Sequence, residues 1–168
     1  MIKEINYAFI DTQNLNLGIK SQGWELDWGK FRLFLRNKYG VKKAFLFVGY
    51  IEKNSSLYRD LERVGYTLIF KKVLKIYKNK KITYKGNIDA ELVLHTMIEI
   101  KNFDKAVIVS GDGDFYCLVE YLESLKKLCK VLTPNSRYSS LLRKYSSYIL
   151  DISSLRKKLG KKGEAFPR

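Results

Sequence analysis

Two aspartates, Asp112 and Asp114, stand one residue apart in the stretch SGDGDF, residues 110–115. Asp and Gly are ordinary turn formers, so a simple loop is one interpretation. Two carboxylates about 4 Å apart repel each other by about 1 kcal/mol in water and about 4 kcal/mol near a protein surface. Such a pair tends to hold a proton or a divalent cation. Carboxylate oxygens suit Mg²⁺ or Mn²⁺, which keep water ligands and contact substrate phosphates.

Two further acids stand where a parallel sheet would bring them to the same edge. Asp11 ends the apolar run NYAFID, and Asp89 opens a helical pattern directly after KGN. An Asx turn at Asp11 and a helix N-cap at Asp89 are the simpler alternatives. Because ligands of open α/β sheets bind beyond the carboxyl ends of the strands, we expect these acids to share one cleft with Asp112 and Asp114.

Apolar runs rich in Val, Ile, Phe and Tyr predict strands that are buried on both faces. They lie at residues 6–11, 43–50, 66–73, 105–110, 129–134 and 148–152. Helical patterns lie at residues 27–40, 55–66, 87–100, 115–128 and 139–147. This alternation predicts an α/β fold in which a mainly parallel central sheet is flanked by helices.

The chain of 168 residues suits one domain, expected at residues 1–155, followed by a basic and poorly ordered tail at 156–168. Lys and Arg number 32 against 17 Asp and Glu, a formal net charge of +15. Such a charge favours a polyanionic partner: RNA, DNA or an anionic membrane surface. We expect a cytoplasmic protein, because there is no membrane-spanning run and no signal-peptide pattern. Cys117 and Cys129 are expected to be reduced core residues.

Residues 71–85 hold seven lysines and no acid. The segment predicts a hairpin that turns at Lys78-Asn79-Lys80, with a solvated loop as the alternative. Because it leads into Asp89, we expect its lysines to border the acids and its tyrosines to stack on unpaired bases. The expected nucleic-acid contacts are Lys78, Lys80, Lys81, Lys85, Tyr77, Tyr84, Arg137, Arg143 and Lys144.

Three stretches resemble, in order, the signatures of NYN domains of the LabA-like group, which are relatives of the PIN nucleases. They are FIDTQNL (9–15), KGNIDAEL (85–92) and VSGDGDF (109–115), and the resemblance spans about residues 4–152. It implies a three-layer, Rossmann-like PIN fold and a ribonuclease site that depends on Mg²⁺ or Mn²⁺.

The resemblance also implies residue roles. Asp11, Asp89 and Asp112 match the metal-binding acids, and Asp114 is a fourth acid beside the metal or one layer behind its ligands. From the residues alone, Asn14 orients a water or phosphate or forms a turn, and Ser110 bonds to Asp11 or caps the turn. The expected catalytic set is Asp11, Asp89, Asp112, Asp114, Asn14 and Ser110.

The leading interpretation is a metal-dependent endoribonuclease acting on single-stranded or structured RNA. The alternative is a catalytically silent RNA-binding or regulatory module, and the oligomeric state, including a homodimer, stays open. A phosphatase of the haloacid dehalogenase type would need Asp-x-Asp after the first strand, where Gln13 takes the second place. His95 is expected to be a packed core residue or to pair with Glu91 on the same helix.

Overall fold

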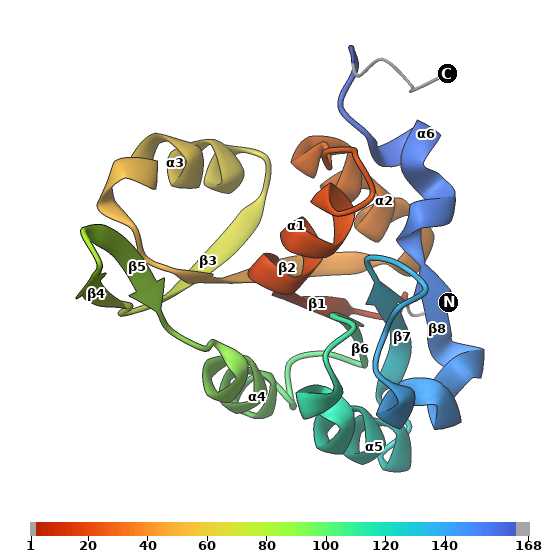
Figure 1. Cartoon of the computed structure of the whole chain (residues 1–168). Coiled ribbons are helices and arrows are strands. Elements are labelled where there is room, and N and C mark those ends of the chain that lie inside the picture. The colour runs from red at the N-terminus through yellow and green to blue at the C-terminus, as the bar shows by residue number, and fades with distance from the viewer. Residues whose placement is uncertain (1–2, 164–168) are drawn as a thin grey trace.

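A six-stranded sheet forms the centre of the computed structural model, which describes residues 3–163. Its strand order is β3–β2–β1–β6–β7–β8, and every neighbouring pair is parallel. The strands are β1 Asn6–Asp11, β2 Val41–Gly49, β3 Tyr66–Lys71, β6 Lys105–Val109, β7 Leu128–Thr133 and β8 Ile149–Asp151. The α/β fold with a parallel central sheet is therefore confirmed (Figure 1).

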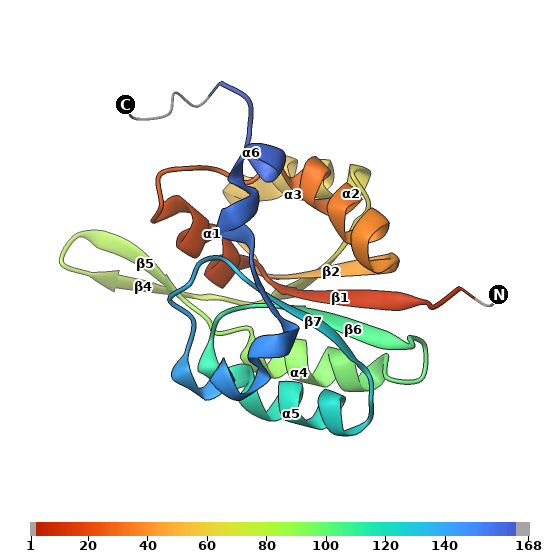
Figure 2. The same ribbon diagram turned by 90° about the vertical axis from the view of Figure 1, so that its right-hand side faces the viewer.

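Helices cover both faces of the sheet, which gives three layers (Figure 2). One face carries α1 Thr12–Lys20, α2 Trp28–Tyr39, α3 Ser55–Arg63 and α6 Arg156–Leu159. The other carries α4 Asp89–Ile98, α5 Tyr116–Ser124 and a 3₁₀ helix at Ser140–Tyr148. The five predicted helical patterns all form helices at these places.

Each face of the sheet has its own hydrophobic core, and the side chains of β1 alternate between the two. Ala8 and Ile10 pack against α1 and α2, whereas Tyr7 and Phe9 point to the opposite face, towards α4 and α5. Because both faces are covered, the strand is a continuous apolar run rather than an alternating one. Asp11 is next in this alternation, so its position on β1 directs it to the α4 side.

The helix α1 was not predicted, and it begins directly after Asp11, which is its N-cap. Its sequence TQNLNLGIK contains two asparagines and a glycine, which are weak helix formers. Leu15 and Ile19, four residues apart, are fully buried against the sheet, and the Asp11 side chain caps the first turn. Tertiary packing of this stripe therefore outweighs the low helix propensity.

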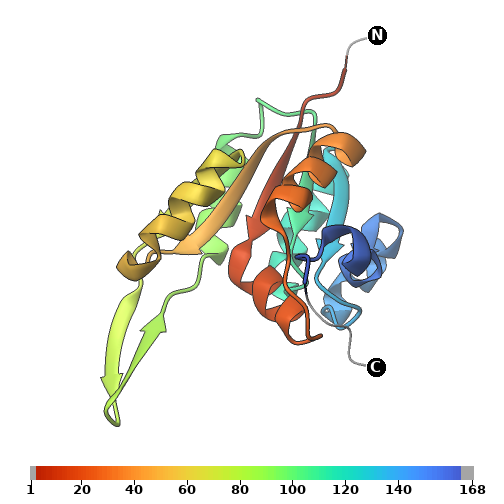
Figure 3. The ribbon, with the colours of Figure 1, turned by 90° about the horizontal axis from the view of Figure 1, so that it is seen from above.

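The predicted hairpin is present as β4 Leu74–Lys78 and β5 Lys81–Lys85. Asn79 and Lys80 connect the strands with φ of 51° and 61°, as in the two-residue turn that matches the twist of an antiparallel pair. The hairpin forms a separate two-stranded sheet and projects from the body of the molecule (Figure 3).

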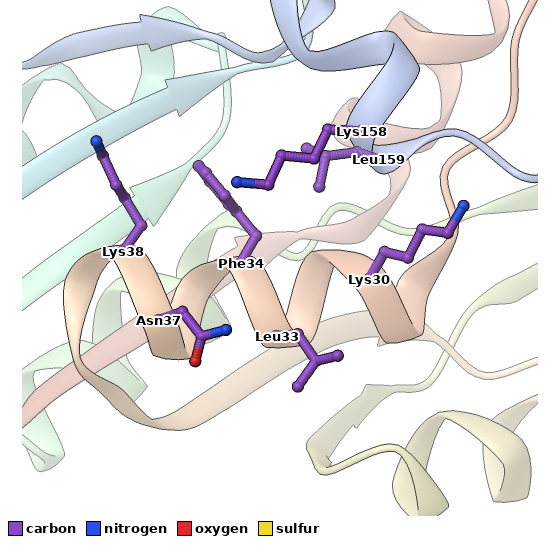
Figure 4. Close-up of a pocket in the computed structure, with 7 residues that line it drawn as sticks. All are labelled: Lys30, Leu33, Phe34, Asn37, Lys38, Lys158 and Leu159. Atoms are coloured by element: carbon purple, nitrogen blue, oxygen red, sulfur yellow. The ribbon is translucent and has the colours of Figure 1, made fainter.

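The region predicted as a poorly ordered tail is structured at its start, since α6 occupies Arg156–Leu159. Leu159 is fully buried in the core, and Lys158 Nζ lies 5.3 Å from the centroid of the Phe34 ring on α2 (Figure 4). Lys158 covers apolar surface with its stem while Leu159 packs inward, which composition alone did not reveal. Residues 164–168 of the predicted tail lie outside the described part of the chain.

The prediction that both cysteines are core residues is wrong for Cys117, which is exposed, whereas Cys129 is half-buried on β7. The helix α5 buries Leu118, Val119 and Leu122, so position 117 faces outward. Both thiols are free.

Within residues 3–163, no helix has the length and apolar character required to cross a membrane.

Candidate metal centre

The parallel pairing of β1 with β6 brings Asp11 and Ser110 together at the carboxyl edge of the sheet. Ile10 pairs with Val109, so Asp11 and Ser110, which follow these two residues, lie next to each other. Both side chains are buried, and Ser110 Oγ donates to Asp11 Oδ2 at 3.3 Å. Only about 5% of Asp11 is exposed, so its carboxylate is held in place by burial as well as by hydrogen bonds.

The loop after β6 presents Asp112 next to this pair. Ser110 Oγ accepts a hydrogen bond of 3.1 Å from the Asp112 N–H, and Asp112 Oδ1 accepts one of 2.9 Å from the Asp114 N–H. A Cβ atom at Gly113 would lie 2.9 Å from the Cβ of Ser139. The glycine therefore allows the loop to approach the chain after β7, and the loop is a fixed turn that aims Asp112.

Asp89 reaches the same place from the first turn of α4. It is not the N-cap: that position is Ile88, and the Asp89 N–H donates to Asn87 Oδ1 at 2.8 Å. Lys71, at the end of β3, donates to the Asn87 carbonyl and pairs with Glu91 Oε2 at 3.4 Å. Lys71 therefore ties the start of α4 to the sheet and positions Asp89.

Asp11, Asp89 and Asp112 each offer a carboxylate oxygen, and these oxygens lie within 4.8 Å of one another. They line a cleft of about 320 Å³ together with Gln13 and Asn14. Three carboxylates form the donor set that hard divalent cations prefer. Asp114 is exposed and does not belong to the three, although its charge acts on Asp89.

The protonation equilibria reflect this crowding. Burial raises the pKa of Asp11 from 3.8 to about 6, and repulsion from Asp89 and Asp112 adds to the rise, against a hydrogen bond from the Asn14 N–H. Burial also raises the pKa of Asp89, with repulsion from Asp112 and Asp114 in the same direction. A bound cation would relieve this repulsion, so the cluster favours binding positive charge.

Asn14 links the two strand ends instead of forming a simple turn. Its Oδ1 accepts a hydrogen bond of 2.9 Å from the Gly111 N–H, and its own backbone N–H donates to Asp11 Oδ1 at 3.2 Å. The residue therefore connects the helix that follows β1 to the loop that follows β6. Its side chain also lines the cleft.

The hairpin separates its expected lysine contacts from its tyrosines. The register pairs Lys78 with Lys81 and Tyr77 with Ile82, and successive residues alternate between faces. Lys78, Lys81 and Lys85 therefore share one face, and Tyr77 and Tyr84 lie on the other. Only the base of the hairpin adjoins the acids, and the tip lies further out by the length of a five-residue strand, roughly 15 Å.

The remaining expected contacts, Arg137, Arg143 and Lys144, differ in their position relative to the acids. Arg137 lines a depression together with Asn14 and Gly111, so it adjoins the cleft. Arg143 and Lys144 are exposed on the 3₁₀ helix at Ser140–Tyr148. The Lys144 ammonium lies 3.8 Å from Glu120 of α5, an exposed pair that stays accessible to solvent.

His95 is a packing residue in this structure. Its ring centroid lies 5.3 Å from that of Phe45 and 5.8 Å from that of Phe47. It does not line the acidic cleft, and Glu91 pairs with Lys71 instead.

Lys71 and Asn87 are the positioning residues that the sequence analysis missed. The Asn two residues before Asp89 was a readable turn signal, whereas the link from Lys71 depends on tertiary structure.

The NYN domain family model matches residues 7–156. The chain belongs to the NYN domain family. This family is part of the PIN-like nuclease superfamily, which confirms the resemblance found in the three motifs.

Two known proteins are similar to this NYN protein over most of its length. The low amplitude and bright protein LabA of Synechococcus elongatus is 24% identical over 156 residues, which are 88% of this chain and 83% of LabA. A protein of unknown function from Vibrio parahaemolyticus, known from a crystal structure, has a TM-score of 0.74 at 21% identity. That alignment covers 95% of this chain and 97% of the other, and it supports the fold.

Proposed function

We propose that this NYN protein is an endoribonuclease that depends on Mg²⁺ or Mn²⁺. The observation that supports the proposal best is the group of three carboxylates within 4.8 Å, at the carboxyl edge of a parallel sheet. These acids belong to a chain whose net charge is +15. A basic protein that concentrates carboxylates at one edge suits a polyanionic substrate whose phosphate is held through a metal.

Asp11, Asp89 and Asp112 would hold the ion, because they offer three oxygens and leave the cleft open on one side. When bound, a divalent ion activates water and neutralises charge at the scissile phosphate. The protein residues around it fix the ligands. Ser110 and Asn14 orient Asp11 and the loop of Asp112, and Lys71 fixes the helix that carries Asp89.

RNA binding is assigned to basic and aromatic side chains on either side of the cleft. Lys85 lies at the hairpin base on one side, and Arg137 lies in the depression on the other. Ammonium and guanidinium groups position the backbone through phosphates, while the acids perform the chemistry.

All three ligands come from one chain, so the activity does not require the homodimer that the sequence left open. The two free thiols fit the expected cytoplasmic setting.

The test is incubation of the purified protein with end-labelled linear RNA, circular RNA and DNA of matched sequence, in Mg²⁺, Mn²⁺ or EDTA. We expect cleavage of linear and circular RNA in either metal and none in EDTA, because an endonuclease needs no free end. Asp60→Asn, which changes an exposed acid of α3 outside the cluster, is the matched control for Asp112→Asn. RNA binding without cleavage in either metal would favour the silent RNA-binding module instead.

A further inference from the structure

A second cavity lies beside the acidic cleft, and Tyr84 of the hairpin forms part of its wall. Its volume is about 280 Å³, close to the lower end of small-ligand pockets, about 300 Å³. The two hollows share Gln13, Gly86 and Ile88 in their walls. A strand bound at the acids therefore lies next to this cavity.

The wall of this cavity is neutral, although the chain is strongly basic. Aromatic side chains form part of it: Trp28, Phe47, Tyr58 and Tyr84. No lysine, arginine, aspartate or glutamate contributes to the wall within the described residues. A site for a phosphate would need positive charge, so this wall fits an uncharged, flat ring.

Side-chain amides in the wall are available to form hydrogen bonds with such a ring. Gln13, Asn16 and Asn54 line the cavity, and their side-chain amides make no hydrogen bond within residues 3–163. Thr12 also lines it, and its Oγ1 is buried without a hydrogen-bond partner in the same part of the chain. A bound base would give the Thr12 hydroxyl a partner, and a buried polar group without one is costly. The three amides are accessible to solvent, and an amide can pair with both donors and acceptors on the edge of a base.

We propose that this cavity receives one unpaired nucleobase of an RNA strand, next to the phosphate that lies at Asp11, Asp89 and Asp112. The proposal rests on the proposed function for the identity of the strand. The aromatic side chains contact the face of the base, and the amides contact its edge. The base must leave a duplex to enter, so the substrate is single-stranded RNA or an unpaired nucleotide in structured RNA.

The hairpin extends the same surface outward. Tyr84 belongs to the cavity wall, and Tyr77 lies on the same face of the hairpin, diagonally across the two strands. Tyr77 is 74% exposed. Exposed tyrosines at this spacing form a platform on which the next base stacks. The strand thus runs from the acids through the cavity onto the tyrosine face of the hairpin.

The test uses the four ribonucleoside 5′-monophosphates and ribose 5-phosphate, titrated into ¹⁵N-labelled protein in EDTA. We expect at least one nucleotide to shift the Trp28 indole signal and the side-chain amide signals of Asn16 and Asn54. The Trp24 indole serves as an internal control because Trp24 is in the core and does not line the cavity. No shift with any nucleotide, or equal shifts with ribose 5-phosphate alone, would overturn the proposal.

Variants give the second readout. Replacing Asn16 and Asn54 together by Ala should weaken nucleotide binding by about 5-fold to 100-fold, the loss of two hydrogen bonds. Asn37→Ala is the matched control, since Asn37 is an exposed amide of α2 outside the cavity. If the double variant binds as tightly as the unchanged protein, the amides do not contact the base and the proposal fails.

The experiment in EDTA separates this proposal from the proposed function. Nucleotide binding needs neither metal nor cleavage, and it should persist in Asp112→Asn. If nucleotides bind at the cavity but RNA is never cut, the nuclease activity is wrong and the base site stands. If RNA is cut in Mg²⁺ but no nucleotide shifts the cavity signals, the base site is wrong and the nuclease activity stands.

Discussion

The side-chain oxygen of Asn14 accepts a hydrogen bond of 2.9 Å from the backbone N–H of Gly111. This contact crosses from α1, whose N-cap is Asp11, to the loop after β6, which carries Asp112. The distance between two of the three candidate metal ligands therefore depends on an amide that holds no metal itself. Contacts of this kind orient ligands in metal sites and tune the affinity.

Asn14→Ala removes that contact and should lower the affinity for Mn²⁺ by about 10-fold to 100-fold. The free energy of unfolding should fall by about 1 kcal/mol through the lost hydrogen bond. Calorimetric titration with Mn²⁺ measures the first effect, and urea unfolding in EDTA the second. Asn16→Ala, two residues along the same helix, should leave Mn²⁺ affinity unchanged. An unchanged Mn²⁺ affinity in Asn14→Ala would remove Asn14 from the site.

Asp112→Asn should reduce RNA cleavage by at least about 100-fold, because it removes one ligand charge from the centre. The variant should fold normally, since Asn caps the turn that Asp112 caps, through the N–H of Asp114. Relief of repulsion should hold or raise the stability without metal by up to about 1 kcal/mol. Full cleavage, or an unfolded variant by circular dichroism, would contradict this role.

The stability of the metal-free protein should depend on pH through Asp11. Its pKa is about 6 in the folded protein against an ordinary value of 3.8. The folded state therefore binds more protons between these values, and the contribution of Asp11 is present at low pH and lost as pH rises through 6. Between pH 4 and pH 7 the unchanged protein should lose up to about 3 kcal/mol relative to Asp11→Asn.

Urea unfolding in EDTA at several pH values measures this difference, and the Asp11→Asn variant serves as the reference because it cannot titrate there. The difference should shrink when Mg²⁺ is present, because the ion stabilises the charged carboxylate. A difference in stability that does not change between pH 4 and pH 7 would show that Asp11 is ionised as easily in the folded chain as in the unfolded chain.

Replacing Lys78, Lys80 and Lys81 by Ala should weaken RNA binding without slowing cleavage at saturating RNA. If all three ammonium groups touch phosphates, the slope of log affinity against log salt should decrease by roughly two to three units. The matched control removes the same charge from Lys42, Lys101 and Lys126, which are exposed near the amino ends of the strands. Equal slopes for the two triple variants would show that the hairpin tip is a solvated turn.

The strands and the placement of the acids were predictable because each rests on a local pattern. Asp11 and Asp112 follow buried apolar runs, and parallel strands end at one edge, so their proximity follows from strand order. The helix α1 was missed because its asparagines and glycine give it a weak helix signal, although Leu15 and Ile19 show the spacing of a buried stripe.

Other features depend on contacts that no local pattern contains. Lys71 belongs to a lysine-rich segment from which we predicted RNA contacts. Its ammonium group instead donates to the Asn87 carbonyl and forms an ion pair with Glu91. The apolar run around Cys117 does not reveal which side of α5 faces the sheet, because apolar residues surround the helix on most sides. The neutral cavity beside the acids combines residues from α1, α3 and the hairpin, so only the folded chain shows it.

The most direct measurement for the metal centre is anomalous diffraction from crystals soaked in Mn²⁺. We expect one strong peak between the carboxylates of Asp11, Asp89 and Asp112, with oxygen ligands near the distance of about 2.0 to 2.1 Å that Mg²⁺ requires. The same soak of Asp112→Asn crystals should show the peak weakened or lost. A saturating soak of the unchanged protein that leaves this position without a peak would show that the three acids do not hold a divalent ion.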